Sequence, residues 1–166
     1  GGTGGFASTT GNTVFGYLAG QSIDSGSINN TFIGHAVSDA TMNDATHNTG
    51  VGADALTSLT TGNYNVSIGS RSGDGLLGGN FNVFIGDYAG HTTTALSSAI
   101  LIGHAAGGSA DMISDADGTI AIGYQSLTSN VSGQANIAIG KNTLYENTIG
   151  DNNIAIGNLA MDDTLA

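Results

Sequence analysis

The sequence lacks cysteine, proline and tryptophan, and it has only two basic residues, Arg71 and Lys141, against 13 acidic ones. Without cysteine, the chain has no disulfide framework and no thiolate metal site. With a formal net charge of −11, it has no cationic surface with which to bind nucleic acid or an anionic membrane. No apolar run approaches the roughly 20 residues of a membrane helix, so we expect no membrane insertion.

Charged residues are also scarce, at 9% of the chain against about 25% in ordinary domains, whereas 28 of the 166 residues are glycine. High charge and abundant proline, which usually mark a disordered chain, are both missing. Gly, Ser, Thr and Asn are weak helix formers, and few apolar stripes of 3.6-residue period occur. The composition therefore favours short strands joined by tight turns.

A five-residue motif recurs nine times along the chain. It consists of Asn, a β-branched residue, a variable residue, Ile and Gly, as in Asn30–Gly34 and Asn153–Gly157, although individual positions vary. The motif glycines follow one another at intervals of 17, 18 or 20 residues: Gly16, Gly34, Gly52, Gly69, Gly86, Gly103, Gly123, Gly140 and Gly157. Repeats of this length are the signature of a solenoid, in which each copy forms one coil.

Alternation within the motif strand predicts two faces. The residue before each glycine is aliphatic or aromatic, and we assign this column to the core of the coil: Phe15, Ile33, Val51, Ile68, Ile85, Ile102, Ile122, Ile139 and Ile156. The preceding column points the other way, and we assign its apolar members to a subunit interface: Val14, Phe32, Phe84, Leu101, Ala121, Ala138 and Ala155. Burial on both faces is typical of parallel strands.

The column four positions before the glycine is asparagine in seven copies: Asn12, Asn30, Asn48, Asn65, Asn82, Asn136 and Asn153. Stacked asparagines form amide ladders from coil to coil. Asparagine also favours the turn that opens a strand, and the two interpretations are compatible. With two short strands and two turns in each coil, nine coils make a flattened all-β, parallel β-roll or β-helix of about 43 Å.

The run Asn136–Gly140 and its sister copies resemble the repeats in the YadA-like heads of trimeric autotransporter adhesins. Longer copies, such as Phe81–Gly90, resemble repeats in bacteriophage tail-fibre proteins. The resemblance covers residues 12 to about 160 and implies a left-handed parallel β-roll. The repeat of about 17 residues is longer than that of the adhesin heads. Because a single narrow stack encloses few side chains, burial of both strand faces together with the resemblance leads us to expect a homotrimer.

Two groups of residues are weak candidates for metal binding. Asp115 and Asp117 precede Gly118 in the longest repeat and match a fragment of a calcium loop, but the other ligands are missing, which favours an acidic surface loop. His35 and His104 follow motif glycines four coils apart, so they do not share a metal within one chain. The varied residues that follow the other motif glycines indicate that this column faces solvent. No motif of a nucleophilic or metal-dependent enzyme is present, and we expect neither catalysis nor a cofactor.

We divide the chain into a Gly/Ser/Thr-rich junction, residues 1–11, and a repeat domain, residues 12–166, and we expect further segments on both sides. The leading hypothesis is an extracellular, rigid spacer or head in the trimeric tail fibre of a virus particle, used in attachment to a host cell. The alternatives are a bacterial surface adhesin head and a self-assembling extracellular filament. The expected partners are further copies of the chain and a glycan or protein of the host-cell surface.

Overall fold

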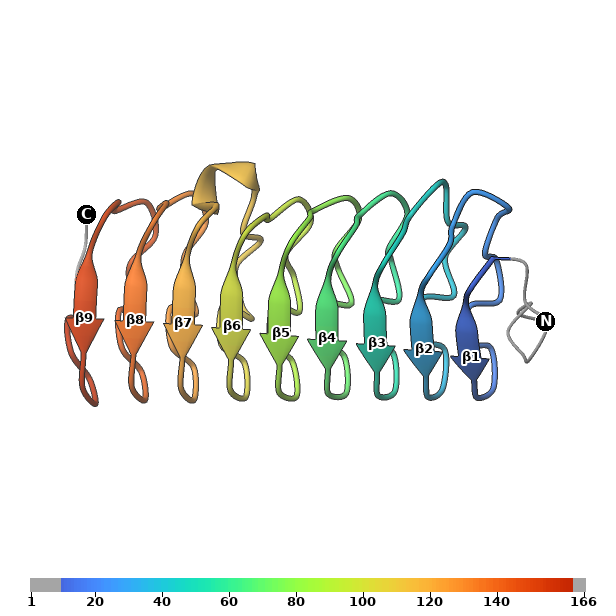
Figure 1. The fold of residues 1–166 in the computed structure, drawn as a ribbon. Helices are drawn as coiled ribbons and strands as arrows, with labels where there is room; N and C mark the ends of the chain where they lie inside the picture. The colour runs from blue at the N-terminus through green and yellow to red at the C-terminus, as the bar shows by residue number, and fades with distance from the viewer. Residues whose placement is uncertain (1–9, 163–166) are drawn as a thin grey trace.

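The computed structural model describes residues 10–162, so most of the predicted junction, residues 1–11, lies outside the described part. The fold is an all-β solenoid, as predicted, in which nine parallel strands form one sheet in the order of the sequence (Figure 1). The strands are β1 (Thr13–Phe15), β2 (Thr31–Ile33), β3 (Thr49–Val51), β4 (Val66–Ile68), β5 (Val83–Ile85), β6 (Ile100–Ile102), β7 (Ile120–Ile122), β8 (Ile137–Ile139) and β9 (Ile154–Ile156). We number each coil after its strand.

Every strand pairs in register with the equivalent positions of the next strand, as Thr31 with Thr49 and Val83 with Ile100. The 20-residue interval between β6 and β7 is accommodated by a short 3₁₀ helix, η1 (Ser114–Ala116), which bulges from the row of coils in Figure 1. Since the insertion lies outside the strand, it leaves the sheet unbroken.

Each coil contains one strand, so the prediction of two strands per coil was wrong. The rest of the coil consists of turns in which residues such as Asp54 and Leu56 adopt left-handed backbone conformations, with φ of +56° and +52°. A chain that bends this often does not form a second extended strand. Backbone hydrogen bonds between coils nevertheless continue through the turns, for example from the Ala36 N–H to the Tyr17 carbonyl at 2.8 Å.

The motif glycine ends each strand with a backbone conformation that other residues avoid. Its φ lies between +128° and +142° in all nine copies. A Cβ atom added to Gly86 would lie 2.6 Å from the carbonyl oxygen of Gly103, because successive glycines stack closely. Both constraints require glycine at this position.

The two strand faces are the reverse of the sequence-based assignment. The column assigned to the subunit interface lies inside the single chain: Phe32, Phe84, Leu101, Ala121, Ala138 and Ala155 are buried, and Val14 packs against the same core. The column assigned to the coil core faces outward, at intermediate to high exposure: Phe15, Ile33, Val51, Ile68, Ile85, Ile102, Ile122, Ile139 and Ile156.

The asparagines explain why the faces are reversed. Each motif asparagine lies two residues before the middle of the strand and therefore shares its face. In every copy but Asn153, the side-chain amide donates a hydrogen bond to a carbonyl on the opposite side of the coil, as Asn48 Nδ2 does to the Gly62 carbonyl at 2.8 Å. The asparagine face must therefore be the inner one, and the β-branched residues on either side of the middle position point to solvent.

The predicted ladder is present in two pieces. The first links Asn12, Asn30, Asn48, Asn65 and Asn82 through side-chain hydrogen bonds of 3.0 to 3.2 Å, and the second links Asn136 and Asn153 at 3.1 Å. All but Asn153 are buried. Between the pieces, Ala99 and Thr119 occupy the column, and the Thr119 hydroxyl bonds the Ala116 carbonyl at 2.8 Å.

The core keeps its volume constant by pairing large residues with small ones. Where the middle of the strand is small, the residue four positions after the glycine is large in most coils, as in the pairs Gly50 with Leu56 and Ala138 with Leu144. Coil 4 is the exception, because Ser67 and Gly73 are both small and the Phe84 ring of coil 5 packs over Gly73. Where the middle is large, the later position is small. A Cβ atom at Gly90 would lie 3.2 Å from the Phe84 ring. Most coils therefore hold about one bulky side chain at this level, and in coil 4 the Phe84 ring of the next coil takes that place.

Candidate functional site

An outward-facing strip of β-branched and apolar residues covers the sheet from end to end. It contains the column before the glycine, from Phe15 to Ile156, and a second column two positions earlier: Thr13, Thr31, Thr49, Val66, Val83, Ile100, Ile120, Ile137 and Ile154. Ile33 and Ile68, in the interior of the row, remain 38% and 40% exposed. We call these two columns the apolar strip.

The strip is long and narrow. Nine strands at about 4.8 Å give a length of about 43 Å, and three residues at about 3.3 Å give a width of about 10 Å. The flat area is therefore roughly 430 Å², which is comparable to the largest apolar patches on monomeric proteins, and such patches often mark contact surfaces.

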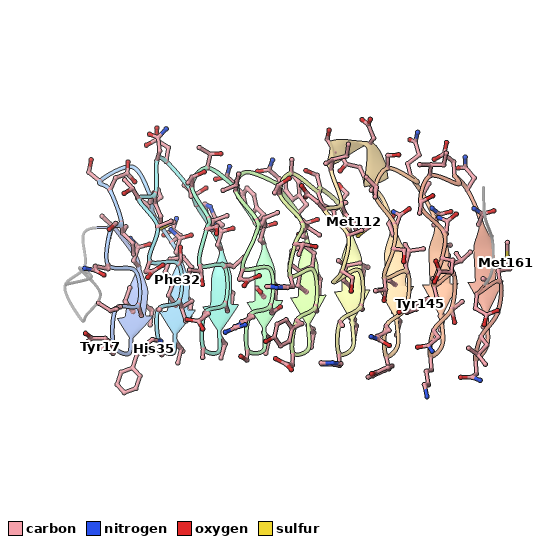
Figure 2. The ribbon with its side chains drawn as sticks, turned by 180° about the vertical axis from the view of Figure 1, so that it is seen from behind. Tyr17, Phe32, His35, Met112, Tyr145 and Met161 are labelled. Atoms are coloured by element: carbon pink, nitrogen blue, oxygen red, sulfur yellow. The ribbon has the colours of Figure 1, made fainter. Side chains whose placement is uncertain are left out.

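A column of exposed side chains borders the strip where the strands end, directly after the motif glycine. We call it the carboxyl edge: Tyr17, His35, Ala53, Ser70, Asp87, His104, Tyr124, Lys141 and Asn158. Tyr17 stacks on His35 with ring centroids 5.6 Å apart, and His104 stacks on Tyr124 at 5.3 Å. Figure 2 shows Tyr17 and His35 together at this end of the coils.

The two basic residues of the chain lie at this same border. Arg71 donates a hydrogen bond to the Tyr88 hydroxyl at 2.9 Å and lies 3.9 Å from the Asp54 carboxylate. The ammonium group of Lys141 lies 5.7 Å from the centre of the Tyr124 ring. These cations therefore interact with residues of neighbouring coils, and at an exposed surface each contact contributes little to stability.

A second column of exposed side chains borders the strip where the strands begin, just before the asparagine column. We call it the amino edge: Gly11, Asn29, His47, Tyr64, Phe81, Ser98, Gly118, Ala135 and Asn152. His47, Tyr64 and Phe81 form a continuous stack with ring centroids 4.7 and 5.2 Å apart. Tyr64 is 49% and Phe81 61% exposed, and this aromatic ladder was not predicted from the sequence.

One titratable pair lies away from the strip. The Asp74 carboxylate contacts His91 Nδ1 at 2.5 Å, and both side chains are partly buried. Burial raises the pKa of Asp74, and the hydrogen bond from His91 opposes that increase. The pair joins adjacent coils, and the Tyr88 ring packs edge-on against His91 with ring centroids 4.9 Å apart.

The predicted metal candidates do not come together. Asp115 lies in η1 and is exposed, whereas Asp117 Oδ1 accepts a hydrogen bond from the Ser97 backbone N–H at 2.7 Å. His104 lies 3.3 Å from the Asp87 carboxylate, and His35 lies 3.7 Å from Asp54. Within residues 10–162, no group of three or more His, Cys, Asp or Glu side chains is placed to hold a metal ion.

No described helix is long and apolar enough to cross a membrane. Comparison with protein-family models, curated proteins and solved structures gives no match for this chain. The functional assignment therefore depends on the geometry of the strip and its two edges.

Proposed function

We propose that this chain is a structural segment of a homotrimeric fibre, in which three solenoids pack their apolar strips around a common axis. The observation that carries the proposal is the strip itself, which runs across all nine strands without an inserted residue. Exposed Ile and Val in such a continuous array gain free energy when they leave water. The middle column of the strand is already used by the core, so self-assembly involves the outward columns instead.

The choice of three copies follows from the resemblance of the repeats to those of trimeric heads. Each strip loses about 430 Å² of flat area whether it meets one other strip or two. The total area that leaves water is therefore about 860 Å² for two copies and about 1,300 Å² for three.

The mechanical role follows from how the coils are joined. The strands, the turns and the asparagine ladder all carry hydrogen bonds from one coil to the next. Such a stack resists bending and holds whatever is attached to it at a fixed distance. The net charge of −11 keeps neighbouring fibres apart in solution. Together with the resemblance of the repeats, these features support a rigid spacer or head in a viral tail fibre used in host attachment.

The experiment that tests self-assembly is a mass measurement by light scattering on the wild-type chain and two aspartate variants. We expect about 49 kDa for the wild type, three chains of 16.4 kDa. Ile85→Asp places a charge in the strip and should reduce the mass to that of one chain, with the circular dichroism spectrum retained. Ala95→Asp adds the same charge at an exposed position outside the strip and should leave the trimer intact. A monomeric wild type would overturn the proposal.

A further inference from the structure

The two edges of the strip show an inverse relation in side-chain size, coil by coil. Where the amino edge has a ring, the carboxyl edge has a smaller residue: His47 with Ala53, Tyr64 with Ser70, and Phe81 with Asp87. Where the carboxyl edge has a large side chain, the amino edge is small: Tyr17 with Gly11, His104 with Ser98, Tyr124 with Gly118, and Lys141 with Ala135. Coils 2 and 9 have residues of moderate size at one or both edges.

Contacts within one chain do not explain this relation. The two edges of a coil are separated by the motif strand, from the asparagine to the glycine, which spans about 13 Å of extended chain. Among the described residues, the ring contacts between members of one edge run from coil to coil, and no ring contact joins the two edges. When two columns of side chains are inversely related in size but do not touch within one chain, we expect them to contact each other across an interface between two chains.

We infer that the carboxyl edge of each solenoid packs, coil against equivalent coil, on the amino edge of the next copy. This inference rests on the proposed self-assembly and specifies how the copies fit together. Rotation about an axis parallel to the solenoid keeps each coil at its own height. It also brings the end of one strand next to the beginning of the equivalent strand in the adjacent copy. Tyr124 of one chain then lies over Gly118 of the next, where no side chain obstructs it.

The charged residues near the edges favour the same arrangement. Arg71 follows Ser70 at the carboxyl edge, so it approaches Tyr64 of the adjacent copy, where a guanidinium and an aromatic ring attract each other. In an antiparallel pair of strips, by contrast, coil 5 meets coil 5 of the second copy. That geometry places the exposed Asp87 carboxylates against each other, which is unfavourable. The edges therefore specify a parallel, in-register assembly.

Cysteine cross-linking tests the arrangement, because the natural chain has no cysteine. The double variant Ala135→Cys and Lys141→Cys places one thiol at each edge of coil 8. A disulfide forms when the two Cα atoms lie about 4.4 to 6.8 Å apart. After mild oxidation, we expect bands at two and three times the 16.4 kDa chain mass, which disappear on reduction. Each single variant should stay uncross-linked, and so should Ser98→Cys with Lys141→Cys, because two coils, about 10 Å, separate these positions.

The possible failures can be told apart. A trimeric mass without in-register cross-links would overturn this inference and leave the proposed trimer standing. Cross-linking of the single variant Phe81→Cys to itself would also overturn it, because that product requires antiparallel strips. A monomeric mass for the unmodified chain would overturn the proposed self-assembly, and the inference with it.

Discussion

Replacing Phe84 tests whether the middle column of the strand forms the core of the single chain. Phe84 is fully buried, and its ring packs over Gly73 and Gly90, where added Cβ atoms would lie 2.6 and 3.2 Å away. Truncation to alanine in a packed core costs about 3–5 kcal/mol. For a domain of this length, that corresponds to a melting temperature lower by about 6–20 °C. If the column lay at a subunit interface instead, the variant would dissociate the assembly and leave the fold of each chain intact.

The structure also predicts how the Phe84 cavity is refilled. Leu56 occupies, in coil 3, the position that Gly73 occupies in coil 4, with nearly the same φ of +52° against +58°. Gly73→Leu alone should cost about 2–5 kcal/mol, from overpacking against Phe84 and from left-handed backbone strain. In Phe84→Ala with Gly73→Leu, the leucine enters the vacated space. Burial of its side chain returns about 2 kcal/mol. The double variant should therefore be at least as stable as Phe84→Ala.

Thermal denaturation at one fixed protein concentration measures this coupling, with Leu77→Ala as the control. Leu77 is 46% exposed and adjoins the buried Leu76, so its truncation should change stability by less than about 0.5 kcal/mol. The reasoning would be refuted if the costs of Phe84→Ala and Gly73→Leu simply added, because residues that compete for one space must show a coupling free energy.

Four further predictions concern the ladder, the turns, one carboxylate and the edges. Asn65→Leu removes hydrogen bonds to Asn48 and to the Gly79 carbonyl and should lower the free energy of unfolding by about 2–5 kcal/mol in chemical denaturation. Asn158→Leu, at an exposed position, should change it little. Equal effects of the two substitutions would contradict the ladder. Ala135 has a left-handed φ of +53°, so Ala135→Gly should leave stability unchanged or raise it by up to about 1 kcal/mol. Ala53 has no positive φ, so Ala53→Gly should lower stability. A loss of stability in both variants would argue against the turn geometry. The Ser27 hydroxyl lowers the pKa of Asp24 below the ordinary 3.8, so the ionised carboxylate stabilises the fold above that pH, and this contribution is lost as the pH falls through the lower pKa of the folded state. The difference in melting temperature between the wild type and Asp24→Asn should therefore disappear in acid. A difference that stays constant with pH would count against this role of Asp24. Ser98→Tyr should weaken the proposed trimer in sedimentation, and the second change His104→Ser should restore it. If the new ring only extends the Phe81 stack of its own chain, Ser98→Tyr will instead be neutral or stabilising.

The repeat was sufficient to predict the solenoid, the parallel sheet and the asparagine ladder. These features depend on residues that recur at a fixed interval, and equal positions of successive coils must stack if the chain closes each coil in the same way. The inward and outward faces of the strand were not predicted correctly. Both columns are apolar in most copies, so hydrophobicity alone does not distinguish them. The distinguishing signals were present, in the asparagine two residues before the middle position and in the pairing of Gly50 with Leu56.

The edges were predicted only in part. The exposure of the column that contains His35 and His104 agrees with its variable composition, whereas the stack of His47, Tyr64 and Phe81 was missed. These three residues precede the motif and lie 17 positions apart, so their proximity becomes evident only when the coils are superimposed. Left-handed backbone at each of them, with φ of +57° to +60°, holds the rings at the border of the sheet.

The sequence alone determined that this chain folds into stacked coils, because the interval between motif glycines sets where each coil closes and which residues lie above one another. Only the tertiary structure decided which side of the strand is the interior. Closing a coil places the strand opposite its own turns, and the asparagine amides can reach the carbonyls of those turns from one face alone. The bulky aliphatic residues of the motif, from Ile33 to Ile156, are thereby left on the outside, where they form the apolar strip that we propose as the contact surface between copies.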